Sequence, residues 1–182
     1  MSEYSDNKML EVMNKHFSED TRFYKNPSDN ISRRRNTERW LYEEFKIKGG
    51  KPKNKYPRYF VLGNSSYLEE YSGFDGNFTT IEIPLKEINE LEISFTYPDS
   101  VVSRWLAEEK NDDYYNSDYH GQLFMLEEIQ RLVKKYYITG EEWRDTPNRK
   151  YDFFIEAQVW NLKPLMKYKN KYNNTLHRCR GS

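Results

Sequence analysis

The sequence predicts an α+β fold: a single domain with a mixed or mostly antiparallel sheet of about five strands and three or four helices. Its 182 residues are enough to bury a core in one domain. Aromatic residues make up 16% of the chain, which favours a folded protein over a disordered one. Strand-like and helix-like patterns follow one another without regular βαβ alternation, which is typical of an α+β fold.

The first helices are expected before residue 50. A short amphipathic helix is expected around Met9–Phe17, and a stronger one from about Asn30 to Lys48. Asp29 is the expected N-cap of the second helix, because its carboxylate can accept backbone N–H groups at a helix start. Gly49-Gly50 should end that helix, since glycine readily adopts the left-handed conformation found just past a helix end.

Five segments have the patterns of strands. Arg58–Gly63 is continuously apolar at its centre, which predicts a strand covered on both faces. Phe78–Ile83 and Glu92–Tyr97 alternate between apolar and polar residues, as half-buried strands do. Tyr119–Phe124 and the longer Tyr151–Trp160 complete the expected sheet.

Four further helical segments are expected between these strands. Asn64–Gly73 and Leu85–Glu90 predict a short helix and a helical turn, and Asp99-Ser100 opens another short helix. The clearest helical pattern covers Met125–Tyr136, where apolar residues recur at +4, +7, +8 and +11. Acidic residues in its first turn and lysines in its last turn complement the helix dipole.

Three regions are expected along the chain: an N-terminal helical extension at 1–20, the α+β domain at 21–160, and a basic flexible tail at 161–182. The tail holds six lysine and arginine residues and no acidic one, so the rest of this neutral chain carries a charge of −6. A basic tail can attract nucleic acid, whereas an acidic body repels it. Nucleic acid binding is therefore expected only through the tail, for which a merely solvated terminus is the alternative interpretation.

Composition also predicts where the protein acts. No apolar run approaches the roughly 20 residues that a membrane helix needs, and the polar N-terminus is unlike a signal peptide. We therefore expect a cytoplasmic protein with no membrane contact. Two alanines against 16 asparagines and 16 tyrosines are typical of AT-rich genomes, which favours a bacterial or phage origin.

The residues that usually build metal or nucleophile sites are scattered. His16, His120 and His177 have no metal-ligand spacing, and the single Cys179 lies in the expected tail. Neither a glycine-rich phosphate loop nor a nucleophile elbow is present in the sequence. We accordingly expect no metal site and no resident cofactor.

The last expected strand carries the most informative pattern. Alternation places Phe154, Glu156, Gln158 and Trp160 on one face, opposite an unbroken apolar face. A carboxylate and an amide between two aromatic side chains suit a pocket for a planar ligand. The alternative interpretation is an ordinary solvent-facing side that a loop covers.

This pattern resembles enzymes of the ADP-ribosyltransferase fold, which carry a Glu/Gln-x-Glu pair on a late strand, a basic residue on an early strand and a hydroxyl or aromatic residue between them. The resemblance implies that Arg22 holds NAD, that Tyr59 or the Asn64–Tyr67 run supplies the middle element, and that Glu156 is the catalytic acid. That acid would stabilise the oxocarbenium-like centre formed as nicotinamide leaves. The residues that flank Glu156 would bind the cofactor: Phe154, Gln158 and Trp160.

A second candidate cluster combines Asp99, Ser100 and Ser103 with His120. Helix N-termini present free N–H groups that can bind an anion, and a nearby histidine can act as an acid or base. The alternative is that Asp99 or Ser100 only caps the helix and that His120 hydrogen-bonds to backbone.

The run Arg33–Arg35 can clamp phosphate or an acidic partner, or Arg34 can simply pair with Glu38 four residues later. With 16 tyrosines and four tryptophans in a polar chain, several aromatic side chains must reach the surface, where they favour protein recognition. The sequence thus supports two hypotheses: an intracellular protein-binding or regulatory module of bacterial or phage origin, or an NAD-dependent ADP-ribosyltransferase-like enzyme. Whether the protein is an enzyme stays open.

Overall fold

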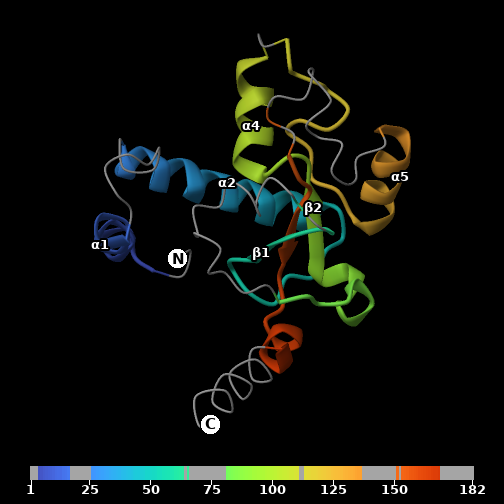
Figure 1. Ribbon diagram of the computed structural model, residues 1–182, viewed down its shortest axis with the longest axis horizontal. Helices are drawn as coiled ribbons and strands as arrows, with labels where there is room; N and C mark the ends of the chain where they lie inside the picture. Colours follow the sequence, from blue (N-terminus) through green and yellow to red (C-terminus); the bar gives the residue numbers. More distant parts are fainter. Residues whose placement is uncertain are drawn as a thin grey trace, which may run out of the picture.

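The computed structural model describes residues 4–16, 26–63, 65, 81–110, 113–136, 151 and 153–168. Helices and a small sheet make up the described part, in agreement with the expected α+β class (Figure 1). In chain order the elements are α1 (Asp6–His16), α2 (Pro27–Ile47), β1 (Arg58–Val61), the 3-10 turns η1 (Leu85–Glu87) and η2 (Glu90–Glu92), β2 (Ile93–Thr96), α4 (Ser100–Glu109), α5 (Leu126–Tyr136) and β3 (Glu156–Val159).

The described sheet has three strands in the order β1-β3-β2, and β3 runs antiparallel to both neighbours. The strand nearest the C-terminus is therefore the central one (Figure 1). In the register, Gln158 lies opposite Tyr59 on one side and Ser94 on the other. Because side chains alternate along a strand, these three residues share one face of the sheet.

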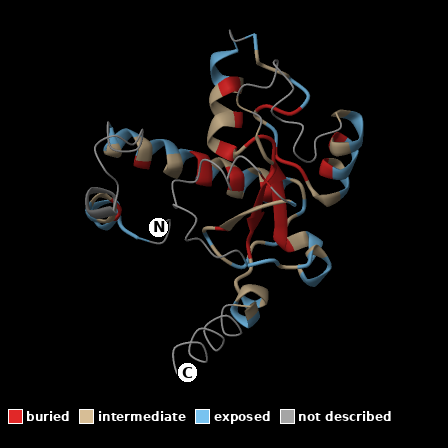
Figure 2. Ribbon diagram, viewed as in Figure 1, coloured by how far each residue is buried: buried red, intermediate tan, exposed pale blue. Residues whose placement is uncertain are grey.

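The other face of the sheet is apolar. Ala157 lies between Phe60 and Phe95 in the register, and Ile129 of α5 packs in the same buried cluster. Leu132 follows Ile129 after one helical turn, so α5 lays one apolar stripe on this face. Most of the buried apolar residues belong to this cluster, which is the main core (Figure 2).

Helix α2 covers the opposite face of the sheet. Leu41 and Phe45 are fully buried, and the Phe45 ring stacks on Trp160 with centroids 5.3 Å apart. The helix ends at Ile47 with Lys48 as its C-cap, and Gly49 follows with a φ of +87°. A Cβ on Gly50 would lie 2.4 Å from the Phe45 ring, so this position requires glycine. The expected helix and its glycine stop are confirmed.

The start of α2 differs from the prediction. Asn26 is the N-cap residue and Pro27 occupies the first turn, whereas the expected cap Asp29 lies inside that turn. Proline fixes φ near the helical value and needs no N–H bond at this position, so the helix begins earlier. Helix α1 packs on this end of α2 through Met9 and Ile31.

Two other helix starts are capped by side chains. The Asp99 carboxylate accepts hydrogen bonds from the backbone N–H groups of Val101 and Val102, at 3.1 and 3.2 Å. The capping interpretation of Asp99 is therefore confirmed. At α5, the Glu128 carboxylate accepts the Met125 N–H at 2.8 Å and pairs with Lys48 at 2.8 Å, which ties the end of α2 to the start of α5.

The expectation of about five strands is wrong for the described residues, which form three. Tyr119–Phe124 is mainly a turn, and only Phe124 forms a bridge, to Phe95. Gly121 has a φ of +73° there, and a Cβ would lie 2.4 Å from Ala107, so the chain bends where alternation predicted a strand. The long strand expected at Tyr151–Trp160 is confined to Glu156–Val159.

Other expectations are tested only in part. Residues 81–83 of the strand expected at Phe78–Ile83 are not in a strand, and residues 78–80 lie outside the described ranges. The helix expected at Asn64–Gly73 also lies outside them, apart from Ser65. β1, expected to be covered on both faces, is a half-buried edge strand. Within the expected basic tail, residues 163–168 are helical.

Among the described helices, none combines the length and apolar character required to cross a bilayer.

Candidate functional site

The face of the sheet beneath α2 is a buried polar network. The Gln158 side chain is fully buried, and its amide nitrogen donates to Thr96 Oγ1 and Glu156 Oε1, both at 3.0 Å. Its amide oxygen accepts the Ser94 hydroxyl at 2.9 Å. Ser94 Oγ in turn accepts the indole N–H of Trp160 at 2.9 Å. The central strand thus holds an internal chain of hydrogen bonds.

Glu156 ends this chain beside the start of α4. Glu156 is only 6% exposed, and its Oε1 also accepts a hydrogen bond from the backbone N–H of Ser100 at 3.4 Å. Burial raises the pKa of the Glu156 carboxyl, and the nearby Asp99 carboxylate raises it further, while Arg34 lowers it. The hydroxyl of Ser100 is buried and has no hydrogen-bond partner among the described residues. This corner is therefore polar but enclosed.

A second buried carboxylate, Glu38 of α2, lies against β1. Its oxygens are 3.4 Å from Arg34 Nε and 3.5 Å from Arg35 Nη1, and the Tyr59 hydroxyl donates to Oε1 at 3.5 Å. The Arg34 guanidinium also lies over the Tyr59 ring, 3.7 Å from its centroid. Burial raises the pKa of the Tyr59 hydroxyl well above its ordinary value, so the hydroxyl stays protonated. The predicted Arg34–Glu38 pair is confirmed.

The structure brings four of the predicted site residues together. Tyr59, Glu156 and Gln158 share the polar face, and Trp160 joins them at its end. The alternative of a solvent-facing side is wrong, because α2 covers this face. Phe154 lies half-buried before β3, and Arg22 falls outside the described residues.

The second predicted cluster has the geometry of a structural turn. His120 is buried, and its Nδ1 accepts the backbone N–H of Asn116 at 2.9 Å. The expected backbone bond of His120 is thus confirmed, although the residue lies in a turn rather than a strand. Ser103 Oγ accepts the Gly121 N–H at 3.0 Å and lies 3.5 Å from the Tyr119 carbonyl, to which it donates. These contacts fasten the turn to α4.

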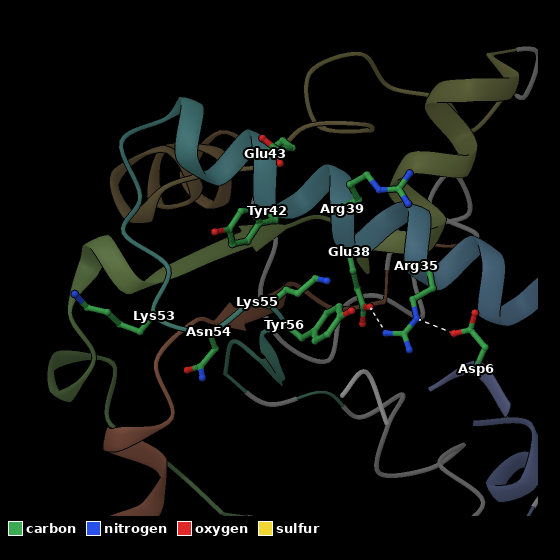
Figure 3. A pocket seen from close by; sticks show the side chains of 10 residues that line it. All are labelled: Asp6, Arg35, Glu38, Arg39, Tyr42, Glu43, Lys53, Asn54, Lys55 and Tyr56. Atoms are coloured by element: carbon green, nitrogen blue, oxygen red, sulfur yellow. Dashed lines mark hydrogen bonds and ion pairs between the residues drawn. The ribbon is translucent and has the colours of Figure 1, made fainter. Parts of the chain in front are cut away.

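A pocket of about 690 Å³ lies between α2 and the loop before β1 (Figure 3). One wall is α2, the other is the loop of residues 53–56, and α1 reaches its edge. The lining residues are Asp6, Arg35, Glu38, Arg39, Tyr42, Glu43, Lys53, Asn54, Lys55 and Tyr56. The volume is within the range of small-molecule and cofactor pockets.

The loop wall is fixed to the sheet by backbone contacts. The N–H groups of Lys53 and Asn54 both donate to the carbonyl of Trp160, at 3.1 and 3.0 Å. Asn54 Oδ1 accepts the Leu162 N–H at 3.3 Å. On the opposite wall, the Tyr42 ring packs edge-on against the Trp160 ring, with the ring centroids 5.8 Å apart. Both walls of the pocket are therefore anchored to the residue that follows β3.

The charged residues that line the pocket fall into two groups, those in ion pairs and those without one among the described residues. Arg35 pairs with Asp6 at 3.1 Å and with Glu38, and its guanidinium lies 5.1 Å from the Tyr56 ring centroid (Figure 3). Among described residues, no ion pair neutralises the other charged lining residues: Arg39, Glu43, Lys53 and Lys55. These four residues carry three positive charges and one negative charge, and with Arg35, Asp6 and Glu38 included the lining has a net charge of +1.

The sequence interpretation missed this pocket. Positions 35, 39, 42 and 43 recur at +4, +7 and +8, so they form a second, polar stripe along α2. The lysines that alternate between residues 51 and 55 were a further signal. No pattern in the sequence indicates that residues 53–56 pack beside α2.

No metal site is evident in the described ranges, where histidine, cysteine and carboxylate side chains form no group of three or more that could hold an ion. Comparison of the chain with family models, with curated proteins and with solved structures gave no significant match.

Proposed function

We propose that this protein is a protein-recognition module that binds a segment of another protein in the pocket between α2 and residues 53–56. The single observation that carries the proposal is the composition of that pocket: arginine, lysine and tyrosine side chains line an open volume of about 690 Å³. Tyrosine and arginine are the residues on which protein interfaces most often depend.

The anchoring of both walls supports the same proposal. The loop is held by two backbone bonds to Trp160, and Tyr42 packs against the ring of that tryptophan. A surface that is ordered before a partner arrives loses less conformational entropy on binding. A pre-formed pocket of this kind suits the docking of a short, flexible peptide segment.

The buried network supports a structural role for the residues first considered catalytic. Glu156 and Gln158 bond to each other and to Thr96 and Ser94 beneath α2. Interior polar groups that satisfy one another in this way order a core. Their hydrogen bonds are accounted for by neighbours in the fold, so a substrate is not needed to explain them.

One observation favours the alternative of an NAD-dependent ADP-ribosyltransferase-like enzyme: Tyr59 and Gln158 are register partners and Glu156 is the next residue on the same face. NAD would reach them only if α2 moved away. Thermal unfolding with and without NAD tests this alternative, because a ligand at 100 times its dissociation constant stabilises a protein by about 2.7 kcal/mol. A rise in wild type that is lost in Glu156→Ala would favour the enzyme.

The experiment that tests the recognition module is a peptide-display selection against the full chain, followed by affinity measurements on a blocked variant. Glu43→Trp adds bulk to the pocket wall at an exposed position, and Gln130→Trp adds the same bulk to the exposed face of α5. Selected peptides should bind wild type and Gln130→Trp equally and lose at least about tenfold in affinity for Glu43→Trp.

If every selected peptide bound Glu43→Trp as tightly as wild type, the pocket would not be the recognition site and the proposal would fail. Circular dichroism and thermal unfolding of both tryptophan variants show whether each is folded, so a loss of binding can be assigned to the pocket.

A further inference from the structure

We infer that the partner segment is acidic, with aspartate or glutamate side chains that the pocket binds through Arg39, Lys53 and Lys55. This inference rests on the proposed function and names the chemistry of its partner. The first step is the local charge: Arg35 is already engaged by Asp6 and Glu38, whereas Arg39, Lys53 and Lys55 have no ion-pair partner among described residues. Opposite charge on a partner would complement them.

The second step is that one of the three cations, Lys55, has an aromatic contact before binding. Lys55 Nζ lies 5.3 Å from the Tyr56 ring centroid, and Lys46, which is not a lining residue, places its Nζ 5.4 Å from the centroid of the pocket residue Tyr42. A cation over an aromatic face is attracted to the ring, which limits its motion. A carboxylate therefore meets at least one charge that is partly ordered.

The third step separates an acidic peptide from nucleic acid. Single-stranded nucleic acid is bound through bases stacked on open aromatic faces. Here Tyr56 has Arg35 and Lys55 over its ring, and Tyr42 has Lys46 over its ring while its edge packs on Trp160. The pocket tyrosines already have partners, so they serve to place cations rather than to stack bases.

Glu43 adds a selective element. Its side chain lines the same pocket as the three cations and has no ion-pair partner among the residues described. A continuous phosphate backbone places negative charge beside every position, including Glu43, and is repelled there. A peptide can place carboxylates opposite the cations and a neutral or basic residue opposite Glu43. Repulsion of the wrong partner is a common source of specificity.

The test uses three fluorescein-labelled probes: a peptide of a dozen residues rich in Asp and Glu, the same peptide with Asn and Gln in their place, and an oligothymidine of similar length. Each is titrated against the full chain by fluorescence anisotropy. Only the acidic peptide should bind, and its dissociation constant should rise when salt is raised from about 50 to about 200 mM.

Paired charge reversals locate the binding. Arg39→Glu with Lys55→Glu should weaken the acidic peptide at least about tenfold. The matched control is Arg33→Glu with Lys134→Glu, which changes the net charge equally at exposed positions on α2 and α5 outside the pocket. This control also accounts for attraction to the basic tail. A lysine-rich version of the peptide should bind the pocket variant more tightly than it binds wild type or the matched control, and circular dichroism shows whether both variants are folded.

The outcomes are distinct. Equal weakening by both charge-reversal pairs, or preferential binding of the oligothymidine, would overturn the acidic-segment inference. If the display selection yields peptides that depend on the pocket but lack acidic residues, the recognition module stands and this inference falls. If no selected peptide depends on the pocket, the proposed function itself falls, and the inference falls with it.

Discussion

Replacing Gln158 by leucine tests the claim that the polar face is a structural network. Leucine has a similar size but cannot hydrogen-bond, so Gln158→Leu removes three contacts: one donated by Ser94 and two donated to Thr96 and Glu156. All three partners are buried and stay in place after the substitution. The variant therefore leaves polar groups in the core without a partner.

The expected cost follows from those three groups. Leaving one buried polar group unpaired costs about 1–3 kcal/mol. Ser94 still accepts from Trp160 and Glu156 still accepts from Ser100, so the low end of the range applies to these two residues, whereas a value nearer the middle applies to Thr96. We expect a total loss of about 4 kcal/mol in the free energy of unfolding, or a fall of roughly 8–16 °C in Tm for a chain of this length.

Urea unfolding followed by circular dichroism measures this loss, with Gln130→Leu on the exposed face of α5 as control. The surface control should stay within about 0.5 kcal/mol of wild type. Ser94→Ala completes a double-mutant cycle, and because Ser94 and Gln158 bond at 2.9 Å, the combined loss should be smaller than the sum of the single losses. Strict additivity, or a loss below about 1 kcal/mol for Gln158→Leu, would show that no such network stabilises the core.

Three further outcomes are expected. Glu156→Gln keeps both hydrogen-bond acceptor contacts but cannot ionise. Because burial raises the pKa of Glu156 in the folded state, wild type should lose stability relative to this variant as pH rises above the ordinary carboxyl value of 4.5. A stability difference that stays constant from acid to neutral pH would contradict this. Asp99→Ala removes two cap bonds of α4 and should cost about 1 kcal/mol in urea unfolding, whereas Asp99→Asn should cost less. Gly50→Ala should lower Tm because its Cβ would overlap the Phe45 ring; Gly50 does not have a positive φ, so an unchanged Tm would remove the steric explanation.

Elements with a strong local pattern were predictable from the sequence. α2 and α5 match their apolar periodicity, and β2 lies inside the alternating segment Glu92–Tyr97. The turn at Gly121 was predicted as a strand because alternation describes side chains and not the backbone. A φ of +73° decides the local path there, and apolar spacing does not reveal it.

The candidate sites show a different limit. Alternation correctly placed Glu156, Gln158 and Trp160 on one face, but the period of a strand does not say what covers that face. The cover is α2, more than a hundred residues earlier in the chain, and its contact with Trp160 is long-range. The pocket depends likewise on the backbone bonds from Lys53 and Asn54 to Trp160, which no local pattern encodes.

The position of Trp160 also gives the protein an intrinsic optical probe. Its indole ring is fully buried, stacked on Phe45 and in edge contact with Tyr42, while its carbonyl holds the loop at Lys53 and Asn54. An indole in such dry surroundings emits at short wavelength, and its emission changes when water or new charge approaches. The Tyr42 wall of the pocket contacts this ring directly, and the loop wall contacts the backbone carbonyl of the same residue. Trp160 emission therefore follows events at the pocket in unlabelled protein, with Trp160→Phe as the blank.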